Sequence, residues 1–328
     1  MRRRAFITLI GGAAAAYPLA ARAQQGKPMR RIGALMGVAN DSEGQIRITA
    51  LRQGLRQLGW TDGVNVQIDV RWGDADIDQI RSDVAELVAS KSDVIVVNSI
   101  RVLNATRQAT REIPIVFLAT SDPVGQGIVA SLAHPGANLT GFMLYEVSVA
   151  GKLAELLKEM VPHLTRVAFL FNPDNLSAEG YWRAIQSVAV SVGMVPVQLP
   201  VRDAASIRDA VDTFARTSNG GLVLPSDVTT IVYRDLIVAL AAQHRLPAAY
   251  SYREVVASGG LMSYGPDTAD LFQRAASYVD RVLKGEKPGD LPVQAPTKFE
   301  FAINLKTVKA IGVEVPTSIL LRATEVIE

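Results

Sequence analysis

Residues 93–119, DVIVVNSIRVLNATRQATREIPIVFLA, contain the pattern that decides the fold. Two apolar runs, Asp93–Asn98 and Ile113–Ala119, flank an amphipathic stretch, Val102–Arg111. Short continuous runs rich in Val and Ile are typical of strands that are buried on both faces. A strand–helix–strand succession of this kind predicts a parallel sheet with helices on both faces.

The same alternation extends on both sides of that segment. Upstream, Arg31–Gly37 and Val64–Trp72 are predicted strands, each followed by a helical pattern. Residues 120–145 interrupt the alternation of strand and helix patterns, because they are rich in Gly and Pro. We expect them to hold only a short helix and to connect two domains. From Lys152 to Tyr250 the alternation starts again. We therefore predict an α/β protein of two doubly wound, Rossmann-like lobes.

The last 65 residues follow a different pattern. Asp267 is expected to cap a helix with one apolar face, three prolines follow, and Phe299–Leu305 alternates as a strand. This arrangement predicts that the chain crosses between the lobes again, which gives a hinge of several segments. The predicted domains are an export signal at 1–23, lobe 1 at 28–142 plus about 263–296, and lobe 2 at 143–262 plus about 297–328.

The N-terminal segment has the layout of an export signal. Three arginines precede 17 uncharged residues, and Ala21-Arg22-Ala23 places small residues where a signal peptidase reads, so we expect cleavage after Ala23. Arg3-Arg4 resembles a twin-arginine signal. The alternative, a membrane anchor, is disfavoured because a span needs about 20 apolar residues. The chain has no cysteine that could carry a lipid. The expected location is the periplasm, as a soluble protein.

Removal of the signal changes the charge of the chain. The segment carries four arginines and no acid, so the net charge of +2 becomes +2 − 4 = −2. A near-neutral surface gives no support for nucleic-acid binding. No later stretch resembles a membrane span, and the absence of cysteine excludes disulfides and thiol chemistry.

Small polar residues follow the predicted strands. Ligands of open parallel sheets bind beyond the carboxyl ends of strands, where helix N-termini present amide groups. The candidates are Asn40, Ser99, Arg101, Ser121, Asp122, Asn172, Ser226 and Asp227. The alternative for each Ser, Asp or Asn is that it caps the next helix. Arg101 could hold a carboxylate in two-point geometry, or could be a solvated surface arginine. Tyr145, Tyr250 and Tyr264 lie near predicted connections and could form an aromatic slot, or could pack the hinge.

Enzymatic and cofactor signatures are weak. Residues 125–130 fit G-x-G-x-x-A, but Asp122-Pro123 intervenes after the strand and Pro135 ends the next helix early. His134, His163 and His244 have no metal-ligand spacing. We expect no metal, no cofactor and no catalytic residues.

Several motifs in order carry a resemblance to a known family. They are Asp122-Pro123-Val124-Gly125, residues 134–141 (HPGANLTG), residues 263–267 (SYGPD), residues 278–285 (YVDRVLKG) and residues 296–306 (PTKFEFAINLK). The chain resembles the ABC-transporter substrate-binding family related to tryptophan- and tyrosine-binding proteins, over essentially all of the mature chain. It differs at residues 98–101 (NSIR), where many relatives have Gly-Thr-Pro.

This resemblance implies a type I periplasmic-binding fold that captures a small polar or carboxylate-bearing solute by hinge closure. The implied solute classes include amino acids and aromatic compounds, and the implied partners are an inner-membrane permease and its ATPase. Three other classes stay open: a periplasmic sensor domain of the same fold, a periplasmic enzyme on the same scaffold, and a DNA-binding repressor. The repressor is disfavoured because no helix-turn-helix precedes Arg31.

Overall fold

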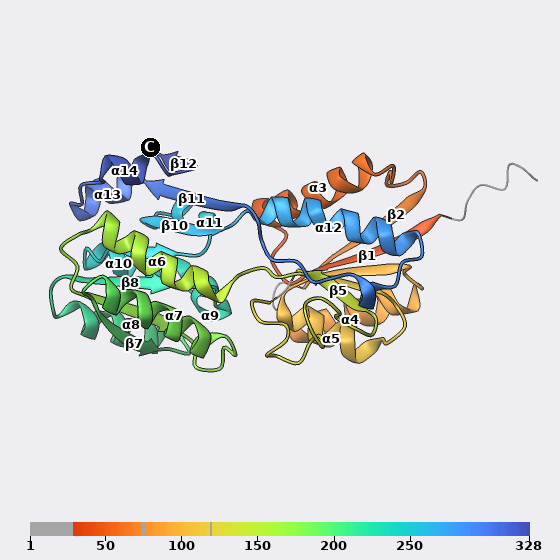
Figure 1. Cartoon of the computed structure of the whole chain (residues 1–328), viewed down its shortest axis with the longest axis horizontal. Coiled ribbons are helices and arrows are strands. Elements are labelled where there is room, and N and C mark those ends of the chain that lie inside the picture. The colour runs from red at the N-terminus through yellow and green to blue at the C-terminus, as the bar shows by residue number, and fades with distance from the viewer. Residues whose placement is uncertain (1–28, 74–75, 119) are drawn as a thin grey trace, which may run out of the picture.

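The computed structural model describes residues 29–73, 76–118 and 120–328. Two α/β lobes lie side by side and are joined by crossing segments (Figure 1). The chain passes between the lobes at residues 143–146, at Asp267 and at residues 295–298. The prediction of two lobes with a hinge of several segments is therefore confirmed.

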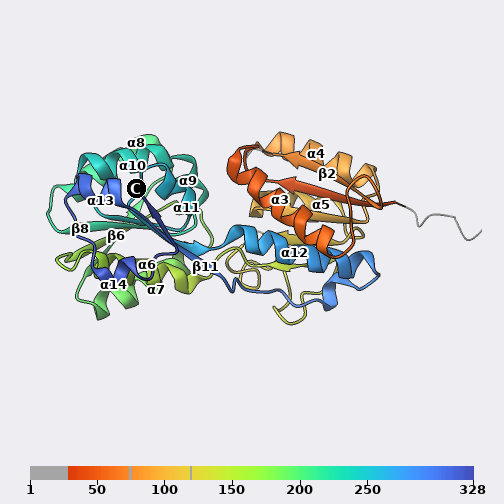
Figure 2. The same ribbon diagram turned by 90° about the horizontal axis from the view of Figure 1, so that it is seen from above.

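Lobe 1 is built on a parallel sheet of strand order β2-β1-β3-β4-β5. Helices α3 and α12 lie side by side over one face, and α4 and α5 cover the other (Figures 1 and 2). The strands are β1 (Arg30–Met36), β2 (Val66–Trp72), β3 (Val94–Asn98), β4 (Ile115–Leu118) and β5 (Leu139–Phe142). The helices are α3 (Ser42–Gln57), α4 (Ile77–Ala89), α5 (Ile100–Ala109) and α12 (Thr268–Leu283).

Strand β5 is a correction to the sequence analysis. Residues 120–138 contain turns and no helix, and Leu139–Phe142 then pairs in parallel with β4, so the expectation of a short helix within a plain connection is wrong. The strand is four residues long and includes Gly141, at φ +156°. A Cβ at this position would overlap the carbonyl oxygen of Phe117. Glycine lets β5 approach β4 closely, and it also weakens the strand pattern in the sequence.

Lobe 2 has the strand order β12-β11-β10-β9-β8-β6-β7, in which only the β10–β11 pair of the described strands is antiparallel. The strands are β6 (Arg166–Phe171), β7 (Val195–Pro200), β8 (Gly220–Leu224), β9 (Ala248–Tyr250), β10 (Met262–Pro266), β11 (Phe299–Asn304) and β12 (Glu325–Ile327). One face packs against α6 (Val147–Met160), α7 (Ala178–Ser191), α13 (Leu305–Ile311) and α14 (Thr317–Leu320). The other packs against α8 (Ala204–Ala215), α9 (Val228–Val232), α10 (Arg234–Gln243) and α11 (Arg253–Ala257).

The C-terminal third of the chain contributes to both lobes. Strand β10 lies between β9 and β11 in the second sheet, whereas α12 packs on α3 in lobe 1. The predicted division at about residue 263 falls within β10. The domain limits themselves stay a prediction.

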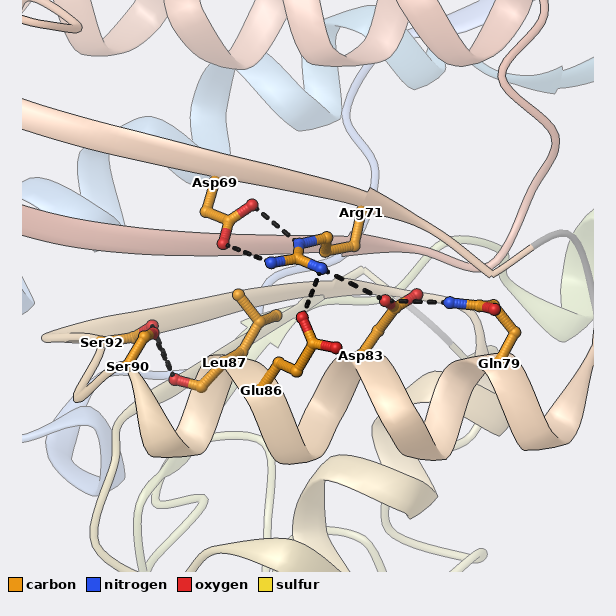
Figure 3. Close-up of polar contacts among 8 residues, drawn as sticks. All are labelled: Asp69, Arg71, Gln79, Asp83, Glu86, Leu87, Ser90 and Ser92. Atoms are coloured by element: carbon orange, nitrogen blue, oxygen red, sulfur yellow. Dashed lines mark hydrogen bonds and ion pairs between the residues drawn. The ribbon is translucent and has the colours of Figure 1, made fainter.

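An ion-pair cluster fixes the edge strand of lobe 1 (Figure 3). The Arg71 guanidinium on β2 lies 2.8 Å from Asp69, 2.7 Å from Glu86 and 3.6 Å from Asp83. Hydrogen bonds to Asp69 and Glu86 raise the pKa of Arg71. Asp83 is buried on α4, where it also accepts a hydrogen bond from the Gln79 amide. The cluster ties β2 to α4, and charged side chains on an edge strand disfavour pairing with another chain.

Candidate functional site between the lobes

The strand ends of both lobes meet at the boundary between them. In a parallel sheet all carboxyl ends lie on one edge, together with the N-termini of the following helices. The side chains that contact the opposite lobe lie in the segments that follow β1 and β4 in lobe 1 and β6 and β9 in lobe 2. The edges of the two sheets that hold the carboxyl ends of the strands therefore face each other.

The first group of contacts is a hydroxyl cluster of Ser121, Gln126, Ser177 and Tyr181. Ser121, after β4 in lobe 1, lies with its Oγ 2.7 Å from the Oγ of Ser177 in lobe 2. The Tyr181 hydroxyl on α7 donates to Ser121 Oγ at 3.1 Å, and the Gln126 amide donates to Ser177 Oγ at 3.3 Å. Tyr181 is buried, and burial raises the pKa of its hydroxyl. The hydroxyl therefore stays protonated and acts as a donor.

The second group is an ion-pair quartet of Glu43, Arg47, Arg253 and Glu254. Arg47 Nη2 on α3 lies 3.3 Å from Glu254 Oε1 on α11, and Arg253 Nη1 lies 3.5 Å from Glu43 Oε1. Arg47 is only 6% exposed. Burial, followed by the nearby charge of Glu254, raises the pKa of Glu43. Two cations and two anions thus join the start of α3 to α11.

The strand orders define what lies between these two groups. In lobe 1, β3 lies between β1, which leads into the quartet, and β4, which leads into the hydroxyl cluster. In lobe 2, β8 lies between β9 and β6 in the same way. The end of β3 and the end of β8 are therefore the strand ends that the two contact groups flank. These ends carry Ser99 and Arg101 on one side and Ser226 and Asp227 on the other.

The end of β3 has an uncommon backbone. Ser99 has φ +90°, and its Oγ accepts a hydrogen bond from Val102 N at 3.4 Å as the N-cap of α5. The neighbouring Asn98 is 2% exposed, and its Oδ1 has no hydrogen-bond partner among the described residues. Arg101 is the second residue of α5 and is exposed. Non-glycine residues at positive φ cluster at functional sites, which makes this turn a candidate for ligand contact.

The end of β8 is held by a network within lobe 2. Asp227 caps α9 through Thr229 N and also accepts from Asn172 N at 3.1 Å and from the Asn175 amide at 2.9 Å. Ser226 Oγ lies 2.6 Å from the Tyr252 hydroxyl. Asp227 and Asn172 therefore order the loops around the site, and Ser226 presents a hydroxyl beside them.

Two other polar candidates lie in turns of lobe 1. Asn40 is exposed, and its Oδ1 accepts from the Gln45 amide at 2.5 Å. Asp122 is also exposed and accepts a hydrogen bond from Gly125 N at 2.8 Å, within the turn that leads to Gln126. Both side chains shape the loops that follow the strands.

The three candidate tyrosines do not form a single aromatic slot, because they lie on two faces of the lobe 2 sheet. Tyr145, in the first crossing segment, is buried edge-on to Tyr181, with ring centroids 5.7 Å apart. Tyr264 stacks on Phe299 at 5.5 Å beside the same core. Tyr250 belongs to the core on the opposite face of the sheet. Its hydroxyl has no partner among the described residues.

The residues that join the lobes were mostly not found by the sequence analysis. Only Ser121 was predicted. Arg47 carried a detectable signal, because it lies four residues before Leu51 on the apolar side of its helix, where a charge needs a partner. The sequence around Ser177 and Tyr181 contains no comparable signal. Within the described ranges no group of His, Asp and Glu could hold a metal ion.

The comparisons with known proteins agree with this architecture. Residues 32–327 match the family model described as ABC transporter substrate binding protein. The chain belongs to that family. A curated member, the tyrosine-binding protein of Clostridioides difficile, is 27% identical over 262 residues, which cover 80% of this chain and 75% of the relative. The relation to tryptophan- and tyrosine-binding proteins is thereby confirmed.

Similar solved structures confirm the fold. A domain from Streptococcus pneumoniae in complex with L-Trp has a TM-score of 0.81 at 25% identity, covering 91% of this chain and 100% of that chain. A conserved domain protein of Vibrio cholerae gives the same TM-score and identity and covers 91% and 99%. The family that residues 32–327 match is the class that the sequence predicted.

Two further points concern the membrane and the N-terminus. Among residues 29–73, 76–118 and 120–328 no helix has both the length and the hydropathy of a membrane span. The predicted export signal and its cleavage after Ala23 lie outside the described residues.

Proposed function

We propose that this chain captures a small, carboxylate-bearing solute of the amino-acid class between its two lobes and delivers it to an ABC permease and its ATPase. The observation that carries this proposal is the placement of the β3 and β8 ends between the hydroxyl cluster and the ion-pair quartet. A ligand there would touch both lobes at once. The ligands named for two relatives, tyrosine and L-Trp, support the solute class.

The solute carboxylate is assigned to the start of α5. Helix N-termini favour anions because their first amide groups lack intrahelical partners. Arg101 in the first turn would add a guanidinium, which forms two parallel hydrogen bonds with a carboxylate. On the opposite lobe, Ser226 offers a hydroxyl donor or acceptor to the rest of the solute. Binding through a helix N-terminus, a guanidinium and a hydroxyl needs no catalytic group, and we propose binding without covalent chemistry.

Hinge closure is the proposed mode of capture. The three crossing segments are the only described connections between the lobes, so rotation within them would separate the opposed strand ends. A solute that contacts both lobes favours the closed form by its differential affinity for that form. The closed, loaded protein would then dock to the permease. We place these events in the periplasm, after export and removal of residues 1–23.

The test is native mass spectrometry of the protein purified from its host, followed by a thermal-shift panel of amino acids, aromatic acids and purines. A retained mass or a melting-temperature increase for an amino acid or aromatic acid supports the proposal. A panel in which only purines or neutral compounds stabilise the protein would overturn the carboxylate assignment. Uptake of the labelled solute by a strain lacking the gene distinguishes transport from sensing, because a sensor domain would leave uptake unchanged.

A further inference from the structure

We propose that the ion-pair quartet of Glu43, Arg47, Arg253 and Glu254 stabilises the closed arrangement of the lobes, and that Arg47 and Glu254 are positioning residues for solute capture. The effect on capture rests on the proposed function, but the effect on closure does not. No residue of the quartet needs to touch the solute.

The geometry of the quartet is complementary between the lobes. Glu43 and Arg47 are four residues apart on α3, so both side chains lie on one side of the helix. Arg253 and Glu254 are consecutive on α11. Each cation therefore lies opposite a carboxylate of the other lobe, at 3.3 Å and 3.5 Å. Reversal of the charge on any one of these four side chains would place two like charges opposite each other.

Lobe 2 holds the Arg253 side chain of the quartet in place without lobe 1. The Arg253 guanidinium makes two hydrogen bonds to Glu325 on β12, one of them 2.7 Å from Nη2 to Oε1. These contacts lie within one lobe and do not depend on closure. They raise the pKa of Arg253 and fix the orientation of the side chain. Lobe 1 therefore meets a guanidinium that is already oriented.

Arg47 depends on the other lobe for its charge pairing. Its side chain is 8% exposed, and among the described residues its one ion pair is with Glu254. Its Nε is buried and has no hydrogen-bond partner in the described part of the chain. A buried charge that loses its partner is strongly unfavourable, so when α3 and α11 separate Arg47 must become hydrated or turn towards Glu43, whose charge lies near it on the same helix. The pair thus distinguishes the closed arrangement from the open one.

The experiment measures the distance between the lobes by pulsed electron paramagnetic resonance in the absence of solute. The chain has no cysteine, so spin labels at Val64→Cys in lobe 1 and Val190→Cys in lobe 2 would be unique. Both positions are exposed, at 71% and 63%. The variants are Arg47→Glu, Glu254→Arg and their combination. Glu254→Gln serves as a milder change in a less buried residue.

The matched control reverses an ion pair inside one lobe. Asp78 and Arg81 pair at 3.3 Å on the exposed side of α4, and Asp78→Arg with Arg81→Asp should leave the distances unchanged. Each single change in the quartet should lower the closed-to-open ratio by a factor of roughly five to thirty. The double exchange should restore the short distance.

Three results would overturn the proposal: unchanged distances in the single variants, a double exchange that remains as open as the singles, or an equal shift in the α4 control. Glu254→Gln must also lengthen the distances, which keeps the test valid if Arg47→Glu fails to fold. Because no solute is present, failure here leaves the proposed solute capture standing. Conversely, a protein that binds no panel compound can still show the closure effect.

Discussion

Replacement of Tyr181 by Phe tests whether the hydroxyl cluster joins the lobes. The Tyr181 ring is buried edge-on to Tyr145 and to Phe169, and Phe preserves this packing. The change removes the hydrogen bond from the Tyr181 hydroxyl to Ser121 Oγ, together with the weaker interaction of this hydroxyl with Ser177. Ser121 keeps its 2.7 Å contact with Ser177, so no buried group is left without a partner.

The expected loss follows from that arrangement. A neutral hydrogen bond contributes about 0.5–1.5 kcal/mol to stability, and the value is about 1 kcal/mol where no buried polar group is left without a partner. Because the bond crosses the lobe boundary, a solute that requires closure should bind about fivefold more weakly. Urea unfolding of the ligand-free protein measures the first quantity, and isothermal calorimetry measures the second.

A double-mutant cycle with Ser121→Ala isolates the contact. The coupling free energy between the two changes should be about 1 kcal/mol, because each removes the same bond. The matched control is Tyr252→Phe, which removes a hydroxyl contact to Ser226 within lobe 2. Tyr252→Phe and Ser121→Ala should be additive within about 0.3 kcal/mol. Additivity of Tyr181→Phe with Ser121→Ala would refute the reasoning.

Four further outcomes are expected. Arg101→Ala should weaken capture of a carboxylate solute by roughly tenfold or more in calorimetry, and equal affinity would remove Arg101 from the site. Saturating solute should reduce the radius of gyration in small-angle scattering, whereas identical curves would contradict hinge closure. Gly141→Ala should lower the free energy of unfolding by more than about 2 kcal/mol, because its Cβ would overlap the backbone of Phe117; wild-type urea stability would count against this packing. Burial, and next the charge of Asp267, raises the pKa of Glu300 to about 6. The folded pKa exceeds the unfolded value of 4.5, so ionised Glu300 costs stability above about pH 6 and the cost disappears as the pH falls towards 4.5. Glu300→Gln should therefore stabilise the protein by about 1 kcal/mol at pH 8, discounted for solvent screening of a half-buried group, and by nothing near pH 4.5. A pH-independent difference in melting temperature would exclude this explanation.

The sequence predicted the parallel parts of the fold because buried parallel strands are continuous apolar runs. Strands β3 and β4 are fully buried and were found within a residue or two of their ends. Strand β5 was missed because Gly141 and a short length hide it among turns. The helical segment after β8 is divided at Tyr233, which ends α9 and begins α10. Apolar spacing alone does not reveal such a break.

The site was predictable only where it depends on topology. The rule that ligands bind beyond the carboxyl ends of strands selected Ser99 and Ser226 as candidates without any knowledge of packing, and their contact with a ligand stays a prediction. The direction of Tyr250 depends on which face of a three-residue strand it occupies, and sequence alone does not settle that. The pairing of Arg47 with Glu254 joins residues 207 positions apart. No local pattern encodes such a contact.

The chemistry of the contacts between the lobes suits the hinge closure that we propose. Apolar side chains at the quartet or the hydroxyl cluster would bind more strongly on closure, but they would face water in the open form and favour permanent contact. Hydroxyls and paired charges exchange protein partners for water at a small net gain. A small gain keeps the closed and open forms close in free energy, so that the differential affinity of a single solute can shift the population. The polar character of both contact groups is therefore what hinge closure requires, and it explains why a buried arginine is placed at the boundary rather than in either core.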